Sequence, residues 1–82
     1  MPPDPALAAE KLYEISSLGS LGEWVVANNP FAPVELLDTL AKSNDWQVRM
    51  FVARNSGAGL ITLAQLEKDT VEEVRQTVGK RR

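Results

Sequence analysis

Chemistry in this 82-residue chain would have to come from carboxylates, cationic side chains and aromatic rings, because the sequence contains neither cysteine nor histidine. Without cysteine there is no disulfide framework, iron–sulfur cluster or thiolate zinc site. Without histidine the commonest metal ligand and the commonest general base at neutral pH are missing. Carboxylates such as Glu35, Asp38 and Asp45 usually serve on helices as solvated surface groups or caps. We therefore expect no catalytic, metal-binding or cofactor-binding residue, no cofactor, and no enzymatic activity.

A glycine-containing segment, Asn55–Gly59, is a second place where chemistry could occur. Glycine-rich turns before a helix expose N–H groups that can hold an anion. The segment lacks the lysine and the spacing of a phosphate-binding loop. We interpret it as a turn between helices, looser than the Asn29–Pro33 turn because Gly57 and Gly59 have high backbone freedom.

Four residues are candidates for binding a partner: Arg49, Arg75, Trp46 and Phe31. Arg49 and Arg75 are 26 positions apart and are expected on one face of the molecule. They could form a two-step basic strip for phosphate or for an acidic partner. Alternatively they pair within the chain, which we favour, and the acids available are Asp45, Asp69, Glu72 and Glu73.

For several aromatic residues, exposure can be predicted from the residue that lies 26 positions later, at the equivalent place in the next unit. Trp46 aligns with Glu72, which predicts an exposed ring that could anchor an interface. A second interpretation, equally open, is that Trp46 folds back as a lid over the 28–33 turn. Phe31 could be exposed or packed. Trp24 aligns with Met50 and is expected to pack, and Phe51 is expected to be partly covered.

The elements that would position these residues recur along the chain. A helix is predicted after Asp4–Pro5, where aspartate is a good N-cap and proline fits the first turn, and it places Leu7, Leu12 and Ile15 on one side. This segment aligns with the one that starts at Asn29–Pro30 at an offset of 25, and the later segments align at an offset of 26. The approximate units are 4–28, 29–54 and 55–80.

Each unit is predicted to contain a short capped helix and a leucine-rich helix. Capping-box pairs are Ser20 with Glu23, Asn44 with Gln47, and Thr70 with Glu73. Apolar stripes at helical spacing predict the buried faces, and no segment alternates with the period of a strand. The stripes are Val48/Val52, Val74/Val78, Leu36/Leu37/Leu40 and Leu60/Leu63/Leu66.

These residues carry a resemblance to a known family. The segments V-R-x-x-V-A-x-N at 48–55 and V-A-x-N-P-x-x-P-x-E-L-L-x-x-L-A at 26–41 resemble the leucine-rich repeat variant family of bacterial proteins. The resemblance implies a right-handed superhelix of alternating α- and 3₁₀-like helices, in which V-R-x-x-V is the short helix. Ala32 replaces the usual threonine, so the following helix is expected to lack a side-chain cap. The resemblance brings no catalytic residues.

The predicted fold is therefore an all-α, right-handed α-solenoid of about three helix pairs (α/3₁₀ or α/α) in a single domain, residues 1–82. Neither a signal peptide nor a membrane span is indicated, so the expected location is the cytoplasm with no membrane partner. Stacked repeats offer an extended surface, which favours a non-enzymatic protein–protein interaction module or scaffold. The alternative is a nucleic-acid-binding module that holds the phosphate backbone. A net charge of −2 argues against that alternative.

Charge also suggests self-association. Residues 1–45 carry a net charge of −5 and residues 46–82 a net charge of +3. We expect Val74 and Val78 to lie on an apolar end that no later unit covers. An acidic half that meets a basic half across a two-fold axis predicts a weak homodimer, or otherwise a monomer that needs another protein partner.

Overall fold

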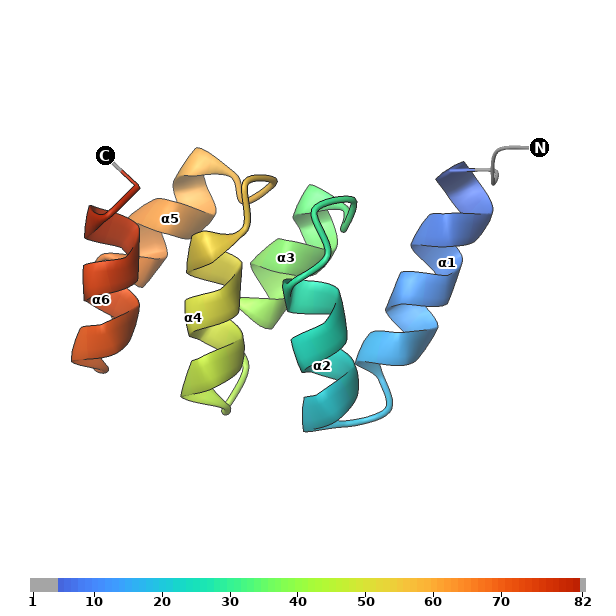
Figure 1. The fold of residues 1–82 in the computed structure, drawn as a ribbon, viewed down its shortest axis with the longest axis horizontal. Coiled ribbons are helices and arrows are strands. Elements are labelled where there is room, and N and C mark those ends of the chain that lie inside the picture. Colours follow the sequence, from blue (N-terminus) through green and yellow to red (C-terminus); the bar gives the residue numbers. More distant parts are fainter. Residues whose placement is uncertain (1–4, 82) are drawn as a thin grey trace.

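The chain is all-helical over the part that can be described. The computed structural model describes the backbone of residues 5–81 and the side chains of residues 10–81. Within that range there are six α-helices and no β-strand (Figure 1). The helices are α1 (Pro5–Ser16), α2 (Ser20–Ala27), α3 (Val34–Leu40), α4 (Trp46–Arg54), α5 (Leu60–Leu66) and α6 (Glu72–Gly79). These bounds confirm the predicted positions of the helices.

The helices form two layers of an elongated slab that measures 41 × 25 × 15 Å. Helices α2, α4 and α6 lie side by side and run in the same direction, with α1 packed against the outer side of α2 (Figure 1). Helices α3 and α5 form the layer behind and run in the opposite sense. Helix α4 is central, because it packs against α2, α3, α5 and α6.

The core lies between the two layers and along the contacts within the front row. The valine stripes are buried as predicted, and so are Leu36, Leu37, Leu40 and Leu66. Leu12 is buried and Ile15 is partly buried, whereas the side chain of Leu7 and the proposed cap Asp4 lie outside the described residues. Leu63 is only partly buried, at the edge of this core.

Two expectations about apolar side chains are wrong. Val74 and Val78 are fully buried rather than uncovered, because α6 packs closely against α4 and their stripe faces that helix. Leu60 is 85% exposed rather than part of a buried stripe. The buried face of α5 is formed by Thr62 and Leu66. Leu60 is six positions before Leu66, and at about 100° per residue it therefore points about 120° away from Leu66 around the helix axis.

The predicted capping boxes are also wrong. Helix α4 is capped by Asp45, one residue after Asn44, and its Oδ1 accepts from the Gln47 N–H at 2.9 Å. Helices α2 and α6 begin after Gly19 and Val71 without a side-chain cap. The expectation for α3 is confirmed, since it begins after Pro33 with no side-chain cap.

Helix type and length differ from what the resemblance implies. All six described helices are α-helices, and no 3₁₀-helix occurs among residues 5–81. The V-R-x-x-V segment lies in the nine-residue α4, whereas the leucine-rich α3 and α5 have seven residues each. The leucine helices begin directly after Pro33 and Gly59.

A tight turn joins α1 to α2, and two glycines make it possible. Gly19 has a φ of 105°, a left-handed conformation that residues with a side chain rarely adopt. Gly22 lies so close to α1 that a Cβ there would come within 1.9 Å of the Ile15 carbonyl oxygen. Any larger residue at Gly22 would push the first two helices apart.

Candidate interaction surface

Arg49 and Arg75 are engaged inside the molecule, at Asp69. Arg49 Nε and Nη2 donate to the two carboxylate oxygens of Asp69 at 2.8 and 3.2 Å, and Nη1 donates to the Ser43 carbonyl at 2.7 Å. Arg75 Nη1 donates to the Asp69 carbonyl at 2.6 Å. Pairing with an acid within the chain is therefore found for Arg49, whereas the exposed Arg75 bonds only a backbone carbonyl. Because its guanidinium is bonded to Asp69 and Ser43, Arg49 is not free to bind a phosphate as part of a basic strip.

The same network sets the electrostatics of Asp69. Burial alone would raise the pKa of Asp69, but hydrogen bonds from Arg49 and from the Val71 N–H, with the positive charges of Arg49 and Arg75, more than offset this. The pKa of Asp69 is therefore held below its usual value. Both side chains of the Arg49–Asp69 ion pair are largely buried, so solvent screens it little.

Trp46, the proposed interface anchor, lies at the first residue of α4 and is 37% exposed. The 28–33 turn comes directly after α2, and α2 ends beside the C-terminal end of α4 (Figure 1). Trp46 is at the other end of α4, its N-terminal end. Nine residues of helix, about 13 Å, separate the two ends of α4. The lid interpretation is therefore wrong, and Trp46 is a partly exposed residue of the opposite edge.

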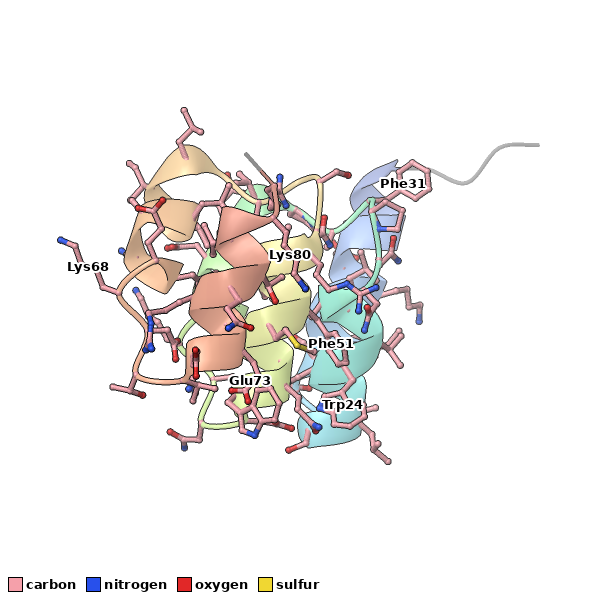
Figure 2. All side chains as sticks on the ribbon, turned by 60° about the vertical axis from the view of Figure 1, so that its left-hand side comes forward. Trp24, Phe31, Phe51, Lys68, Glu73 and Lys80 are labelled. Carbon is pink, nitrogen blue, oxygen red and sulfur yellow. The ribbon has the colours of Figure 1, made fainter. Side chains whose placement is uncertain are left out.

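Phe31 is the most exposed large apolar residue of the described chain, at 87%. Its N–H donates to Asn29 Oδ1 at 2.9 Å, which fixes the turn while the ring projects away from the helices (Figure 2). Trp24 and Phe51 pack as expected, with ring centroids 5.4 Å apart and an interplanar angle of 77°. Trp24 Nε1 also donates to Asp45 Oδ2 at 2.7 Å, a bond that no sequence spacing predicted.

Charge is sorted between the two edges of the front row. Acidic residues occupy the first turns of α2 and α6, and Asp45 caps α4. Basic residues occupy the opposite ends, with Arg54 in the last turn of α4 and Lys80 after α6; Figure 2 shows Glu73 and Lys80 at opposite ends of α6. Three parallel helices align their dipoles, so this sorting is stabilising.

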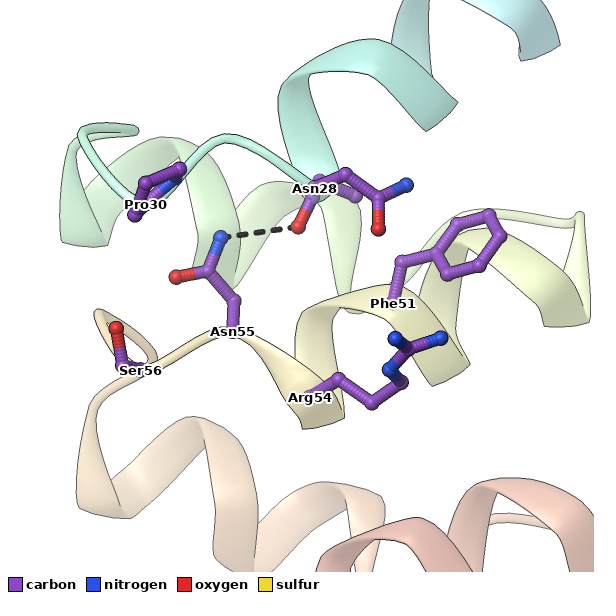
Figure 3. Close-up of a pocket in the computed structure, with 7 residues that line it drawn as sticks. Asn28, Pro30, Phe51, Arg54, Asn55 and Ser56 are labelled. Carbon is purple, nitrogen blue, oxygen red and sulfur yellow. Dashed lines mark hydrogen bonds between the residues drawn. The ribbon is translucent and has the colours of Figure 1, made fainter.

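A pocket of about 300 Å³ lies at the basic edge, between the ends of α2 and α4 (Figure 3). The end of α2 and the turn after it contribute Asn28 and Pro30, and α4 with the residues after it contributes Phe51, Arg54 and Ser56. Asn55 crosses its wall, where Nδ2 donates to the Ala27 and Asn29 carbonyls at 2.9 Å each. The carbonyl ends of two helices meet here, which favours cations over anions, so Arg54 complements the helices rather than forming an anion site.

A larger depression lies on the back layer, between α3 and α5, and the sequence did not predict it. We call it the α3–α5 groove; its volume is about 540 Å³. It is lined by Val34, Glu35, Asp38, Gly59, Leu60, Ile61 and Thr62. Leu60 and Ile61 are 85% and 77% exposed. The only available signal was the replacement of the charged Glu35 by Ile61 at the position 26 residues later.

The polar groups of the groove are unevenly satisfied. The buried Thr62 hydroxyl donates to Asp38 Oδ1 at 3.1 Å, which ties the two helices together. The exposed Glu35 carboxylate has no ion-pair or hydrogen-bond partner among the described side chains, and no lysine or arginine lines the groove. The groove is thus apolar with an acidic rim.

The described residues were also searched for a metal-binding site and for a membrane-spanning helix. No three carboxylates there are grouped so that they could hold a metal ion. None of the described helices is both long and apolar enough to cross a bilayer. Comparison with models of protein families, with curated proteins and with solved structures gives no match for this chain.

Proposed function

We propose that the chain is a small, non-enzymatic protein-binding module of the cytoplasm, a right-handed α-solenoid of about three units that resembles the leucine-rich repeat variant family. Hydrogen bonds at a fixed spacing support the repeat. Asn55 donates to the carbonyls of residues 28 and 26 positions earlier, and Arg81 donates to Ala53 and Asn55 at the same two spacings.

The observation that carries the binding role is the pair Leu60 and Ile61. Two adjacent large aliphatic side chains are almost fully exposed beside an apolar groove. Covering each with a partner would gain about 1.5–3 kcal/mol of hydrophobic free energy. The carboxylates of Asp45 and Asp69 hold structural bonds, which favours binding over catalysis at those two residues.

The alternative, a phosphate-backbone-binding module, has weaker support. Arg49 would be one step of the basic strip, and it is occupied by Asp69. Arg54 and Lys80 are exposed but lie at the carbonyl ends of helices, where they offset the helix dipoles.

The test is capture of partners from cells that make the protein, with an affinity-tagged chain. The double variant Leu60→Ser/Ile61→Ser removes the aliphatic pair. The matched control is Leu18→Ser/Leu21→Ser, which removes two aliphatic side chains of similar exposure, 79% and 76%, from another surface.

We expect specific proteins to be retained by the wild type and by the control and lost by the groove variant, with all three chains equally folded by circular dichroism. An unchanged set of retained proteins after Leu60→Ser/Ile61→Ser would show that the groove is not the binding surface. Retention of nucleic acid that salt disrupts would favour the alternative.

A further inference from the structure

The two walls of the α3–α5 groove differ in chemistry. The lining residues come from α3 on one side and from the start of α5 on the other: Val34, Glu35 and Asp38, then Gly59, Leu60, Ile61 and Thr62. Both ionisable side chains of the lining belong to α3, whereas the α5 side carries no charge. The groove therefore combines an acidic wall with an uncharged wall that bears two exposed aliphatic side chains.

The two walls are held together at two levels. At the start of the helices Gly59 lies against Val34, since a Cβ at Gly59 would be 3.2 Å from Val34 Cγ2. About one turn later, the Thr62 hydroxyl donates to Asp38 Oδ1 at 3.1 Å. Otherwise α3 and α5 pack mainly against the front row rather than against each other. The groove is therefore formed in the free chain, as ligand pockets usually are.

The carboxylates of the acidic wall have no cation beside them. Glu35 is exposed, and its carboxylate has no ion-pair or hydrogen-bond partner among the described side chains. Asp38 is half-buried and accepts the Thr62 hydroxyl with one of its two oxygens. Within the described part of the chain, no lysine or arginine lines the groove. The positive charge that would complement this wall must therefore come from the occupant.

The chemistry of the two walls selects the kind of segment that fits between them. A purely aliphatic segment would cover Leu60 and Ile61 but would take water from the carboxylates without replacing it, which costs free energy. An acidic segment would be repelled. A lysine or arginine satisfies both walls best, because its aliphatic stem can lie along an apolar surface while its charged end reaches a carboxylate.

We propose that the α3–α5 groove binds a segment of a partner protein in which aliphatic side chains stand beside a lysine or an arginine. The cation lies at the α3 wall, and the aliphatic side chains cover Leu60 and Ile61. This inference rests on the proposed function, because it specifies the chemistry of the segment that the groove binds. A second copy of this chain is a weaker candidate, because Val74 and Val78, the predicted apolar end, are buried.

Glu35 also has a role within the fold that the test must separate from binding. It lies in the first turn of α3, where a carboxylate complements the helix dipole. That role affects the stability of the chain and does not depend on the charge of a ligand. The decisive quantity is therefore the ratio of affinities for a cationic and a neutral form of the same peptide.

The probe is a library of random short peptides displayed on phage, selected on the purified wild-type chain. Peptides that also bind Leu60→Ser/Ile61→Ser are removed, and the control Leu18→Ser/Leu21→Ser should retain the remainder. Circular dichroism establishes that each variant is folded. We expect the groove-dependent peptides to combine aliphatic residues with a nearby lysine or arginine more often than the unselected library does.

Each selected peptide is then synthesised with its cation retained or replaced by glutamine, and dissociation constants are measured by fluorescence anisotropy. On the wild type the cationic form should bind about 2- to 5-fold more tightly, as an exposed ion pair would provide, and high salt should reduce this ratio. On Glu35→Gln/Asp38→Asn the two forms should bind equally. The control Glu10→Gln removes an exposed carboxylate of α1 and should keep the wild-type ratio.

Should the double variant lose its fold, Glu35→Gln alone repeats the comparison at an exposed position without touching the Thr62 bond. Groove-dependent peptides with no preference for lysine or arginine would overturn this inference. An affinity ratio that the loss of both carboxylates leaves unchanged would do the same. Either result leaves the proposed function standing, because the groove would still bind a peptide.

Two further outcomes would also overturn the inference. The first is a library that yields no peptide dependent on Leu60 and Ile61; capture from cells then decides the proposed function by itself. The second is a dimer of the purified chain, seen by sedimentation equilibrium, that Leu60→Ser/Ile61→Ser dissociates. That result would identify a second copy as the occupant of the groove.

Discussion

The junction between α2 and α4 and the junction between α4 and α6 place their bonds at equivalent positions but use different chemistry. At the first, the Asn55 amide bonds the end of α2, and Ser43 Oγ donates to Glu23 Oε1 at 3.0 Å. At the second, the Arg81 guanidinium bonds the end of α4, and Arg49 pairs with Asp69. We call them the Asn55 junction and the Arg81 junction.

The comparison shows that equivalent positions keep the same hydrogen bonds between helices and within the turn although the residues that make them differ. Glu23 and Ser43 stand 20 residues apart, as do Arg49 and Asp69, yet acceptor and donor have exchanged sides. The turn bond is retained in both cases, because Ser43 Oγ accepts from the Asp45 N–H as Asp69 Oδ1 accepts from the Val71 N–H. A junction with a serine–glutamate hydrogen bond and a junction with an ion pair thus share one geometry, and the following experiments compare them.

The largest effect is expected from the leucines behind each junction. Leu37 is fully buried, so Leu37→Ala should destabilise the chain by about 2–5 kcal/mol. Leu63, its equivalent 26 residues later, is only partly buried, and Leu63→Ala should cost less than half as much. Urea denaturation measures both. Equal losses would show that the Arg81 junction is packed as tightly as the Asn55 junction.

The bonds at the helix ends come next. Asn55 is buried, so Asn55→Ala leaves two carbonyls and the Gly57 N–H without their partner and should cost about 2–3 kcal/mol. Arg81 is exposed, water can replace it, and Arg81→Ala should cost less than about 1 kcal/mol. Chemical denaturation of both variants gives the ratio. A larger loss for Arg81→Ala would reverse the assignment of strength.

At the edge where α4 and α6 begin, the loss of stability should be larger at the Arg81 junction than at the Asn55 junction. Asp69→Asn leaves a largely buried Arg49 without its counter-charge and should cost about 1–3 kcal/mol. Ser43→Ala removes a neutral donor and should cost about 0.5–1.5 kcal/mol. The double variant, compared with the sum of the two single ones, shows whether the two junctions act independently through α4.

Acid should weaken the Arg81 junction. The pKa of Asp69 is lowered in the folded chain, so its ionised form contributes stability that is present above its unfolded pKa, near the ordinary 3.8, and is lost as the pH falls through the lower folded value. Thermal denaturation between about pH 5 and pH 2 should show a decline that is shallower in Asp69→Asn. Parallel curves for the two chains would mean that Asp69 contributes nothing to the pH dependence.

The smallest expected difference lies in the two turns that follow α2 and α4. The sequence predicts a looser turn at 55–59, yet both turns are closed alike: Asn29 Oδ1 accepts from Phe31 and Asn55 Oδ1 from Gly57, at 2.9 and 2.8 Å. Because Asn55 is buried, we expect the Gly57 amide to exchange with deuterium no faster than the Phe31 amide. Faster exchange at Gly57 would favour the sequence prediction.

A feature could be predicted from the sequence when it depends on residues close together in the chain, and could not when it depends on how separate helices are oriented. The helices, the valine stripes and the burial of Leu37 and Leu40 were readable, because they depend on spacing within one segment. The cap of α4 was missed by one residue, since Asn44 and Asp45 are both good caps and only the backbone path selects Asp45.

Features that depend on how neighbouring helices are oriented were not predictable. Leu60 has the spacing of a core residue, but the orientation of α5 directs its face outward and creates the groove with α3. Among the candidate binding residues, the pairing of Arg49 and the exposure of Trp46 agree with the sequence interpretation, whereas the position of Phe31 was left open and the groove was missed.

The amide of Asn55 also acts as a molecular ruler for chain length. Its two acceptors are 28 and 26 positions earlier, so the bonds fix how many residues lie between successive turns. One inserted residue between Asn29 and Asn55 would have to bulge out in a loop or break both bonds. A whole inserted copy of 26 residues, ending in its own asparagine, would renew them. We therefore expect this backbone to accept an added stretch of 26 residues more readily than a smaller insertion.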